Sequence, residues 1–486
     1  MAGIVVEKCL NFKYSLYSKH MLLIYWKWKV GKGVAKLCDN LRLDYEIRDD
    51  SDAPSSYDAY EAIIPSPGIS PTHPIYATGK ILPELDFAYQ YLPEKCTVIA
   101  VTGTDGKSTT SWILYSILEK EFSGKKSVYL SGNFDIPFSE TVSQIREKWE
   151  KRAIIVVEVS SFMSAFIEKF RPDYALFTNI KPDHLNWHRD LEDYVWAKMR
   201  LLTQAKKKSI INKQIIDFIW ENSLNLTLPL NSRIFEKQEK HTSLAPVPNT
   251  GQKPRDTTNG EDIIISWRRK YKLSETQFSG IHNAMNILGS ALVANEMWLC
   301  AKHIKRYLKD ISGLSHRLEK IGEKNGITFV EDSKSTSSQS LEAALGSYYA
   351  PVIARHEAIQ VPGLLRRYSQ EQNNSSQWLE RKNLLLIVWW SDKWDSFNHL
   401  RPKFQERVKA MACIGATKEK FIEIAQKENI PYIATDVLAD AVEFLWGNAK
   451  NWDVLMLSPW CASFWLFRDY FDRANQFRDI IKKISE

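Results

Sequence analysis

Residues 98–118 read VIAVTGTDGKSTTSWILYSIL, and this stretch decides the fold of the central part of the chain. It begins with an apolar run typical of a buried strand, passes through a turn with two glycines, and ends in a segment typical of a helix. Main-chain amides of such a turn, with the positive end of the helix, can bind phosphate oxygens. Lys107 can reach the transferred phosphate, and the Ser108 hydroxyl can ligate Mg²⁺. The stretch predicts a nucleotide-binding loop, although Val101 stands where the GxxxxGK[ST] pattern has its first glycine.

Strand-like and helix-like segments alternate on both sides of this loop. Apolar runs at 98–102, 153–159 and 174–179 are separated by helical stretches, which predicts a mainly parallel sheet covered by helices. A similar pattern opens the chain at 21–26 and restarts after Gly313. We therefore predict an α/β fold of three domains, each on a mainly parallel sheet: a Rossmann-like N-terminal domain (1–93), a P-loop-type central ATPase domain (94–312) and a Rossmann-like C-terminal domain (313–486) with an insertion at 351–380.

Composition limits the classes of function. The 486 residues are 44% hydrophobic and 25% charged, as in an ordinary soluble protein that is too long for one core. The net charge of +7 comes from cations scattered among nearly as many acids, so we expect no nucleic-acid partner. Six cysteines show no metal-ligand spacing, and we assign neither a disulfide nor zinc. The apolar run at 21–26 is too short to span a membrane, so we expect a cytoplasmic protein without membrane insertion. We also expect a monomer.

The loop sequence TGTDGKSTT at 102–110 resembles that of the Mur ligase and folylpolyglutamate synthetase superfamily, and the resemblance extends over nearly the whole chain. Two smaller motifs agree with it: HNAMN at 282–286, which includes His282, and GLSHRLE at 313–319. The resemblance implies ATP as the nucleotide. The implied ATP-binding residues are Gly103, Thr104, Asp105, Gly106, Lys107, Ser108, Thr109, Asn283, Asn286, Arg317 and Asp332.

A metal site is expected beside the loop. Glu158 ends the apolar run IIVVE, where a carboxylate can hold Mg²⁺ near the phosphates, although alone it would read as a surface acid. The block NIKPDHLNWHRDLEDYVWAKMRLL at 179–202 resembles the family's second metal element, in which the lysine is carbamylated and so becomes an anionic oxygen ligand. The resemblance implies two Mg²⁺ sites with the ligands Ser108, Glu158, His184 and Lys198, and the catalytic residues Lys107, Glu158, His184 and Lys198.

Five further blocks resemble the family's substrate-binding elements. SPGISPTHP at 66–74 resembles the uridine-nucleotide loop, and GNFDIP at 132–137 a contact with the muramoyl substrate. EDSKSTSS (331–338), WWSDKWDSF (389–397) and LSPWCASFWLFRDYFDRANQF (457–477) resemble blocks that receive D-glutamate, whose two carboxylates call for cationic and hydroxyl donors. The implied substrate-binding residues are Ser66, Pro67, Gly68, Asn133, Lys334, Thr336, Lys393, Ser463 and Tyr470.

The implied activity is ATP-dependent ligation of D-glutamate to UDP-N-acetylmuramoyl-L-alanine through an acyl phosphate, a step of peptidoglycan precursor synthesis. Two alternatives stay open. One is another Mur ligase or a ligase similar to folylpolyglutamate synthetase. The other is a catalytically impaired, nucleotide-binding relative.

Seventeen tryptophans occur in the chain, and five of them fall where the family has glycine. With glycine at 26 and 28, the turn WKWKVG would become a regular G-x-G-x-x-G turn, in which glycine lets the backbone approach a phosphate. Our hypothesis is that UGA codons are read as tryptophan in this sequence and as glycine in the source organism. It concerns Trp26, Trp28, Trp389, Trp390 and Trp394, and on weaker grounds Trp298 and Trp452.

Overall fold

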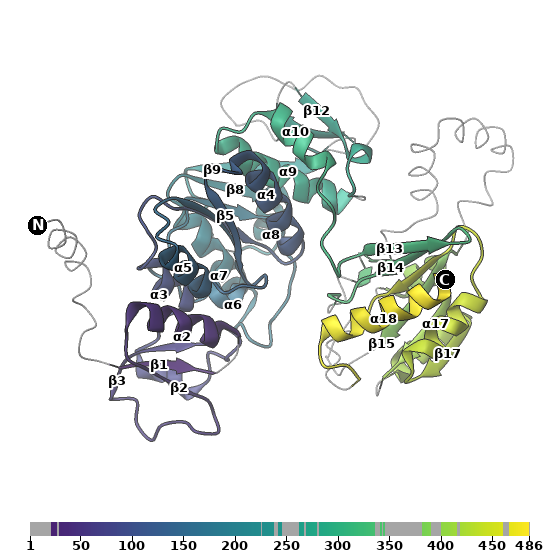
Figure 1. Ribbon diagram of the computed structural model, residues 1–486, viewed down its shortest axis with the longest axis horizontal. Helices are drawn as coiled ribbons and strands as arrows, with labels where there is room; N and C mark the ends of the chain where they lie inside the picture. The colour runs from purple at the N-terminus through teal and green to yellow at the C-terminus, as the bar shows by residue number, and fades with distance from the viewer. Residues whose placement is uncertain are drawn as a thin grey trace, which may run out of the picture. The chain divides into compact units, whose positions relative to one another are not determined.

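The structure is a computed structural model in which three α/β sheets follow one another along the chain (Figure 1). Two compact units contain them: residues up to 275 with 281–311, and residues 276–280 with 312–486. The described residues are 21–26, 29–224, 226–237, 242–244, 262–266, 269–278, 281–335, 341–342, 344–345, 382–389, 400–415, 418–459 and 466–485.

A three-stranded parallel sheet of order β2-β1-β3 opens the first unit. Its central strand β1 is apolar throughout, and its alternate residues pack on opposite faces. Leu22 and Ile24 pack under helix α2, whereas Leu23 and Tyr25 pack against the loop that follows β3. The elements are β1 (Met21–Tyr25), α2 (Lys29–Leu41), β2 (Tyr45–Arg48), β3 (Tyr60–Pro65), the 3₁₀ helix η1 (Pro74–Thr78) and α3 (Glu84–Tyr89).

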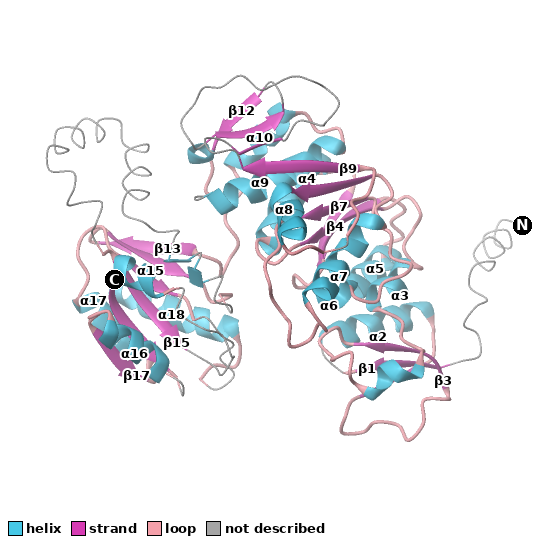
Figure 2. Ribbon diagram, turned by 180° about the vertical axis from the view of Figure 1, so that it is seen from behind, coloured by secondary structure: helices cyan, strands magenta, loops and turns pink. Residues whose placement is uncertain are grey.

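The second sheet of the first unit has the order β12-β11-β10-β9-β8-β7-β4-β6-β5, and Figure 2 labels its strands β12, β9, β7 and β4. Strands β4 to β9 pair in parallel, as the continuous apolar runs predict, and β10 adds antiparallel to β9. The strands are β4 (Thr97–Thr102), β5 (Ser127–Gly132), β6 (Ala153–Glu158), β7 (Tyr174–Phe177), β8 (Lys208–Asn212), β9 (Ser232–Lys237), β10 (Thr242–Leu244), β11 (Asp262–Ser266) and β12 (Arg269–Lys272).

Helices cover both faces of this sheet. Helices α5, α6, α7 and α8 share one core with β4, β6 and β7, and α9 packs on the other face, where Gly289 lies against Leu176. Helices α4 and α10 pack against α9. The helices are α4 (Lys107–Phe122), α5 (Phe138–Glu147), α6 (Ser161–Ser164), α7 (Leu191–Thr203), α8 (Lys213–Glu221), η2 (Leu273–Glu275), α9 (Ile281–Glu296) and α10 (Ala301–Lys309).

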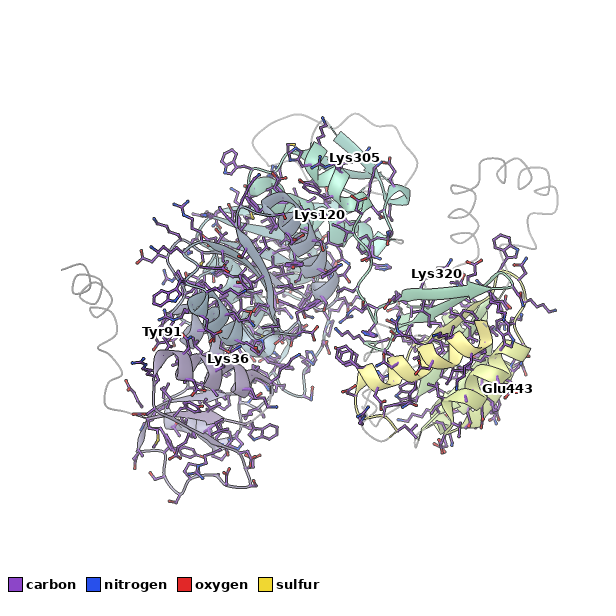
Figure 3. All side chains as sticks on the ribbon, in the orientation of Figure 1. Lys36, Tyr91, Lys120, Lys305, Lys320 and Glu443 are labelled. Carbon is purple, nitrogen blue, oxygen red and sulfur yellow. The ribbon has the colours of Figure 1, made fainter. Side chains whose placement is uncertain are left out.

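The two sheets of the first unit share a hydrophobic core, because α2 packs directly on α5. The contact is close: a Cβ at Gly33 would lie 2.9 Å from the Pro137 Cβ. Lys36, labelled in Figure 3, forms an ion pair with Glu140 of α5 at 3.6 Å. We conclude that the first sheet is fixed to the second by packing as well as by the connecting chain.

The second unit holds a six-stranded sheet of order β13-β14-β18-β15-β16-β17. It is parallel except for β13, which pairs antiparallel with β14. Helices α15 and α16 cover one face, and α17 and α18 cover the other. The elements are β13 (Glu319–Lys324), β14 (Ile327–Glu331), β15 (Leu384–Trp389), α15 (Arg401–Arg407), β16 (Val408–Ile414), α16 (Glu419–Lys427), β17 (Tyr432–Thr435), α17 (Leu438–Gly447), β18 (Val454–Leu457) and α18 (Tyr470–Ser485).

The predicted fold class of three mainly parallel α/β sheets is confirmed. The sequence missed β13 and β17, which lie at the two edges of the last sheet and are only half-buried. The boundaries at 93 and 312 stay predictions, and the predicted insertion at 351–380 lies outside the described residues. Among the described residues, no helix is both long and apolar enough to cross a membrane.

Candidate active site

Four neighbouring strands of the second sheet, in the order β7-β4-β6-β5, end at the same edge. Because they are parallel, their pairing places Glu158 beside Val101 on one side and Gly132 on the other. The segments that begin with Gly103 and Thr178 leave β4 and β7 at this edge. Ligands of open α/β sheets bind at such an edge, outside the carboxyl ends of the strands.

The loop between β4 and α4 requires two of its glycines. Gly103 has φ +154°, and a Cβ there would lie 1.9 Å from the Thr178 Oγ1. Gly106 has φ +73°, and a Cβ there would lie 2.4 Å from the Asn286 Oδ1 of α9. Because both the backbone conformation and the space exclude a side chain at Gly103 and Gly106, only glycine fits these two positions of the loop.

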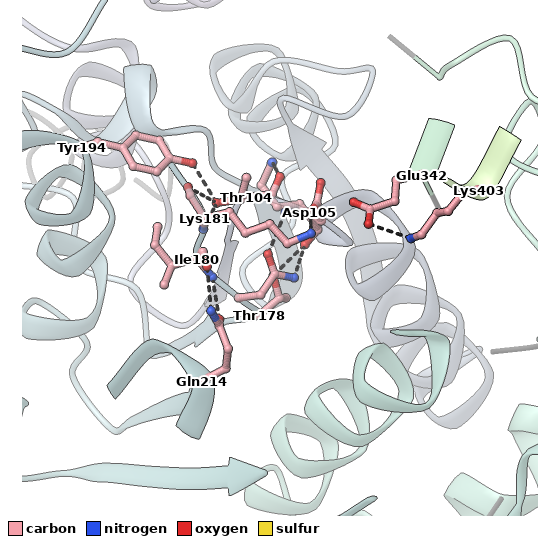
Figure 4. Close-up of polar contacts among 11 residues, drawn as sticks. Thr104, Asp105, Thr178, Ile180, Lys181, Tyr194, Gln214, Glu342 and Lys403 are labelled. Carbon is pink, nitrogen blue, oxygen red and sulfur yellow. Dashed lines mark hydrogen bonds and ion pairs between the residues drawn. The ribbon is translucent and has the colours of Figure 1, made fainter. Parts of the chain in front are cut away.

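Hydrogen bonds from the segment after β7 hold this loop in place. Figure 4 shows Thr104 between Tyr194 and Lys181: its hydroxyl lies 2.9 Å from the Tyr194 hydroxyl and accepts from the Lys181 amide at 3.1 Å. The Asn179 side chain accepts from the Asp105 amide at 2.9 Å and donates to the Asp105 carbonyl at 2.9 Å. The loop is therefore held in shape from outside.

Lys107 is the first residue of α4, and its Nζ donates to the Thr104 carbonyl at 2.7 Å. The predicted reach of Lys107 toward a phosphate stays a prediction. Ser108 and Thr109 follow in the first turn of α4 and are half-buried. The helix N-terminus thus begins directly at the loop, as the sequence predicts.

Lys198 of α7 is buried against the same loop. Its Nζ donates to the Gly103 carbonyl at 2.8 Å and lies 4.7 Å from the centre of the Tyr194 ring. Burial, followed by the charge of Lys107, lowers the pKa of Lys198 well below its usual value. Lys198 is therefore not a solvated surface lysine, and its environment favours loss of its proton.

Glu158 is the last residue of β6 and is 2% exposed. One carboxylate oxygen accepts from the Asn133 side chain at 2.9 Å. The other, Oε2, is buried without a hydrogen-bond partner among the described residues. Since a buried carboxylate oxygen without a partner is costly, this atom is a suitable metal ligand.

His184 follows Asp183 in the segment between β7 and α7, with φ +55° and a side chain that is 45% exposed. Burial lowers the pKa of His184, and the charges of Lys198 and Lys107 act in the same direction. A neutral imidazole can ligate a metal. His188 is the buried neighbour of this segment, and its Nδ1 lies 3.0 Å from Asp193.

Helix α9 supplies the two predicted asparagines. Asn286 accepts from the Thr110 hydroxyl at 3.1 Å and donates to Asn283 at 3.3 Å. Asn286 thus ties α9 to α4 beneath Gly106, which is a structural task that the motif alone did not reveal.

In the second unit, Asp332 follows β14 and is buried. It accepts from the Ser458 hydroxyl at 2.9 Å and from the Leu318 amide at 3.1 Å. Burial raises the pKa of Asp332 to about 7. The predicted supporting role of this residue therefore has a physical basis, since its carboxylate joins two segments to the end of β18.

Two predicted substrate residues of the second unit lie together: the Lys334 Nζ is 5.0 Å from the centre of the Tyr470 ring. The Lys334 amide donates to the carbonyl of His316, the neighbour of Arg317. Thr336, Lys393 and Ser463 lie outside the described residues.

A histidine and two glutamates with metal-ligand spacing also occur in the second unit, namely His316, Glu319 and Glu331. Arg478 forms ion pairs with Glu319 at 2.6 Å and with Glu331 at 3.1 Å, so its guanidinium already neutralises negative charge in this cluster. None of the predicted Mg²⁺ ligands belongs to this cluster.

The predicted uridine loop follows β3. The Ser66 amide donates to the Tyr25 carbonyl at 3.0 Å, and nothing lies within 4 Å of a Cβ at Gly68. The Trp187 indole donates to the Ile69 carbonyl at 3.1 Å, which joins this loop to the second sheet of the unit. Pro67 lines a pocket together with Phe162 and other apolar side chains.

The sequence did not identify Thr178, Asn179 and Tyr194 as parts of the site. Thr178 and Asn179 directly follow a predicted strand, and Tyr194 lies in a predicted helix, which could have indicated them. However, their side chains bond to loop residues that are 70 or more positions away in the sequence. Such pairings depend on the order of strands in the sheet, which the sequence did not give.

The Mur ligase middle domain family matches residues 101–294. A UDP-N-acetylmuramoylalanine-D-glutamate ligase from Aquifex aeolicus is 29% identical over 472 residues, which cover 95% of this chain and 98% of the relative. Its namesake from Elusimicrobium minutum is 27% identical and covers 87% and 85%.

Solved structures share the fold. UDP-N-acetylmuramate-alanine ligase MurC from Thermotoga maritima gives a TM-score of 0.56 at 13% identity, covering 96% of this chain and 99% of that chain. The MurF ligase of Thermotoga maritima, in complex with ADP, gives 0.53 at 14% identity and covers 97% and 96%. At such identities the likeness concerns the fold alone.

Proposed function

Because this chain belongs to the Mur ligase family, we propose that it joins D-glutamate to UDP-N-acetylmuramoyl-L-alanine and converts ATP to ADP and phosphate. The observation that carries the proposal is the similarity to ligases of that name over 95% of this chain and 98% of the relative. The site chemistry fits it, since the Gly103–Lys107 loop suits a nucleoside triphosphate. The proposal places the reaction in the cytoplasm and the chain in a monomer.

In the proposed first step, a carboxylate oxygen of the alanyl substrate attacks the terminal phosphorus of ATP. The bond to ADP breaks, and an acyl phosphate forms. In the second step the amine of D-glutamate attacks the acyl carbon, phosphate leaves, and the amine loses a proton. Such chemistry needs positioning and charge neutralisation rather than a nucleophilic side chain. Lys107 would exchange its bond to the Thr104 carbonyl for one to a phosphate oxygen.

Mg²⁺ would be held by Ser108, Glu158, His184 and Lys198. The buried Oε2 of Glu158 and the lowered pKa of His184 support this assignment, because each offers an unprotonated ligand atom. When bound, Mg²⁺ would neutralise the charge that develops on the phosphates.

Lys198 could ligate only after modification, because an ammonium has no lone pair. Its lowered pKa favours the neutral amine, which can add to CO₂ and release one proton to give a carbamate. A carbamate would supply the anionic oxygens that the metal requires. Burial beside the loop supports this proposal for Lys198 in particular.

The remaining tasks are divided along the chain as the three predicted domains suggest. Residues 1–93 would hold the uridine nucleotide through Ser66, Pro67 and Gly68, residues 94–312 would hold ATP, and residues 313–486 would hold D-glutamate. Closeness of Lys334 to Tyr470 supports the last assignment. Asn133, which donates to Glu158, would contact the muramoyl substrate.

One assay tests the proposal: phosphate release from ATP with UDP-N-acetylmuramoyl-L-alanine and a panel of amino acids. We expect D-glutamate to give the highest rate, with L-glutamate and water as controls. A higher rate with another amino acid would favour a sister ligase. No turnover with any amino acid, in a chain that still binds ATP, would favour the impaired relative.

A further inference from the structure

Four tryptophans have a left-handed backbone conformation, with φ of +81° at Trp26, +54° at Trp149, +70° at Trp298 and +74° at Trp452. They are four of the eleven described residues other than glycine that have positive φ. This region costs an L-residue free energy because the Cβ approaches the backbone, and a bulky residue there is an outlier. Each of the four occupies a position that glycine normally fills.

Trp149 follows helix α5, directly after the C-cap residue Lys148. The Trp149 amide donates to the Arg146 carbonyl at 3.0 Å, and the Glu150 amide to the Ile145 carbonyl at 3.0 Å. These two bonds define a Schellman motif, in which the left-handed residue after the helix is usually glycine. The indole itself is 81% exposed, so packing offsets little of the backbone cost.

Trp298 occupies the same position after helix α9. The Trp298 amide donates to the Asn295 carbonyl at 2.9 Å, and the Leu299 amide to the Ala294 carbonyl at 3.1 Å. Its side chain is 94% exposed. Two helix ends thus place an exposed indole at the position that favours glycine most strongly.

Trp452 is the third residue of a β-turn closed by the bond from the Asp453 amide to the Lys450 carbonyl at 3.0 Å. Asn451, the second residue, has no positive φ, whereas Trp452 does. A turn of this kind is type II, which requires glycine or asparagine at its third residue.

Trp26 joins β1 to α2. A Cβ at Gly31 would lie 2.4 Å from the Trp26 carbonyl oxygen, so the helix packs closely on this turn. In a G-x-G-x-x-G turn the first glycine makes the tight turn and the third allows this close packing. The structure therefore shows the tight turn at position 26 and the close packing at position 31. Position 28, where the pattern has its second glycine, lies outside the described residues.

We infer that positions 26, 149, 298 and 452 carry glycine in the protein that the source cell makes, and that UGA codons there are read as tryptophan in the present sequence. Composition agrees: 20 glycines in 486 residues are about 4%, against a usual share of about 7%. The inference differs from the family comparison, since it includes Trp149 and rests on backbone conformation.

Tryptophans with a structural task are outside the inference. The Trp187 indole donates a hydrogen bond to Ile69, and the Trp446 ring stacks on Phe329 at 5.6 Å. Trp389 has no positive φ, and its buried ring stacks on Phe467 at 5.8 Å, so the backbone gives no support for glycine at 389. Trp390 and Trp394 lie outside the described residues.

The gene and the native protein test the inference directly. We expect UGA at the four codons and UGG at 187 and 446, and peptide masses of the natively made protein that correspond to glycine at the four positions. A UGG codon, or a peptide mass that corresponds to tryptophan, overturns the inference at that position.

A stability comparison in the full-length chain tests the same inference without the gene. Trp149→Gly and Trp298→Gly should each raise the unfolding temperature by about 2–6 °C, because glycine relieves the left-handed strain. Trp220→Gly is the matched control: Trp220 is 79% exposed and lies in the last turn of helix α8 without a positive φ, so glycine relieves no strain there and should lower the unfolding temperature. Equal destabilisation by all three substitutions would overturn the structural argument.

Discussion

Lys198 has the most strongly perturbed environment among the predicted metal ligands of the first unit. It is buried, it donates to the Gly103 carbonyl, and its charge is disfavoured both by burial and by Lys107. Such an environment favours the neutral amine, and a neutral amine can be modified. The two states make different predictions for the enzyme.

Lys198→Ala should lower kcat by roughly 100-fold or more, because it removes a proposed ligand of the Mg²⁺ that would neutralise charge on the reacting phosphates. Lys120→Ala, an exposed substitution on α4, should leave kcat unchanged. Removal of CO₂ should inactivate the wild-type chain, and bicarbonate should restore it. Full activity of the wild type without CO₂ would contradict carbamylation while leaving the ligase assignment intact.

Asp332 gives a pH-dependent stability. Its folded pKa of about 7 exceeds the roughly 3.9 of an unfolded aspartate, so its contribution is complete below about pH 4 and is lost as pH rises to about 7. Asp332→Asn should therefore raise the free energy of unfolding at pH 8 by on the order of 1–4 kcal/mol. In urea titrations the gain should shrink toward pH 4. An equal gain at both pH values would contradict the raised pKa, and the exposed Asp440→Asn is the control.

The loop between β4 and α4 shows how an element is shaped by its neighbours. Gly106 and Gly124 have nearly equal φ, +73° and +71°, but only Gly106 lacks room for a Cβ. Gly124→Ala should cost about 1–2 kcal/mol of stability through backbone strain alone. Gly106→Ala should in addition displace Asn286 and raise the KM for ATP more than tenfold in steady-state assays. Similar effects of the two substitutions on ATP use would show that the contact with α9 is unimportant.

Tyr194 supports the same loop from α7. Tyr194→Phe removes the hydroxyl that lies 2.9 Å from the Thr104 hydroxyl, and a hydrogen bond of this kind contributes about 1 kcal/mol. We expect kcat/KM for ATP to fall roughly fivefold. Tyr89→Phe removes a hydroxyl that donates to the Arg171 carbonyl and should leave kcat/KM unchanged. Equal effects of the two substitutions would contradict a role for Tyr194 in holding the loop.

The elements differ in how far the sequence could predict them. Continuous apolar runs predicted β4, β6, β7, β15 and β18, because a strand that is buried on both faces consists almost entirely of apolar residues. Edge strands such as β17 lack this signal. The loop motif and Glu158 could be placed at one sheet edge, but the bonds from Asn179 and Tyr194 depend on which strands are neighbours. Pairing of that kind is decided by tertiary packing.

At the scale of the whole molecule, the two units have separate hydrophobic cores. Calorimetry should therefore resolve two unfolding transitions. ADP with Mg²⁺ at about 100 times its Kd should stabilise the first unit by about 2.7 kcal/mol, because the loop that ends at Lys107 lies there. Lys107→Ala should abolish this shift. A shift that persists in that variant would place the nucleotide elsewhere.

The packing of α2 on α5, with no room for a Cβ at Gly33, has a consequence for substrate choice. The loop at Ser66 and the loop at Gly103 belong to the same compact unit, in which the two sheets share a core, and the Trp187 indole bonds the first loop to the segment after β7. If these loops hold the two ends of the acceptor, as we propose, the distance between them sets the length of acceptor that fits. An acceptor whose nucleotide end and carboxylate end match this length would then meet the phosphate without rearrangement. A shortened acceptor would place its carboxylate away from the phosphate, even when both of its ends are chemically intact.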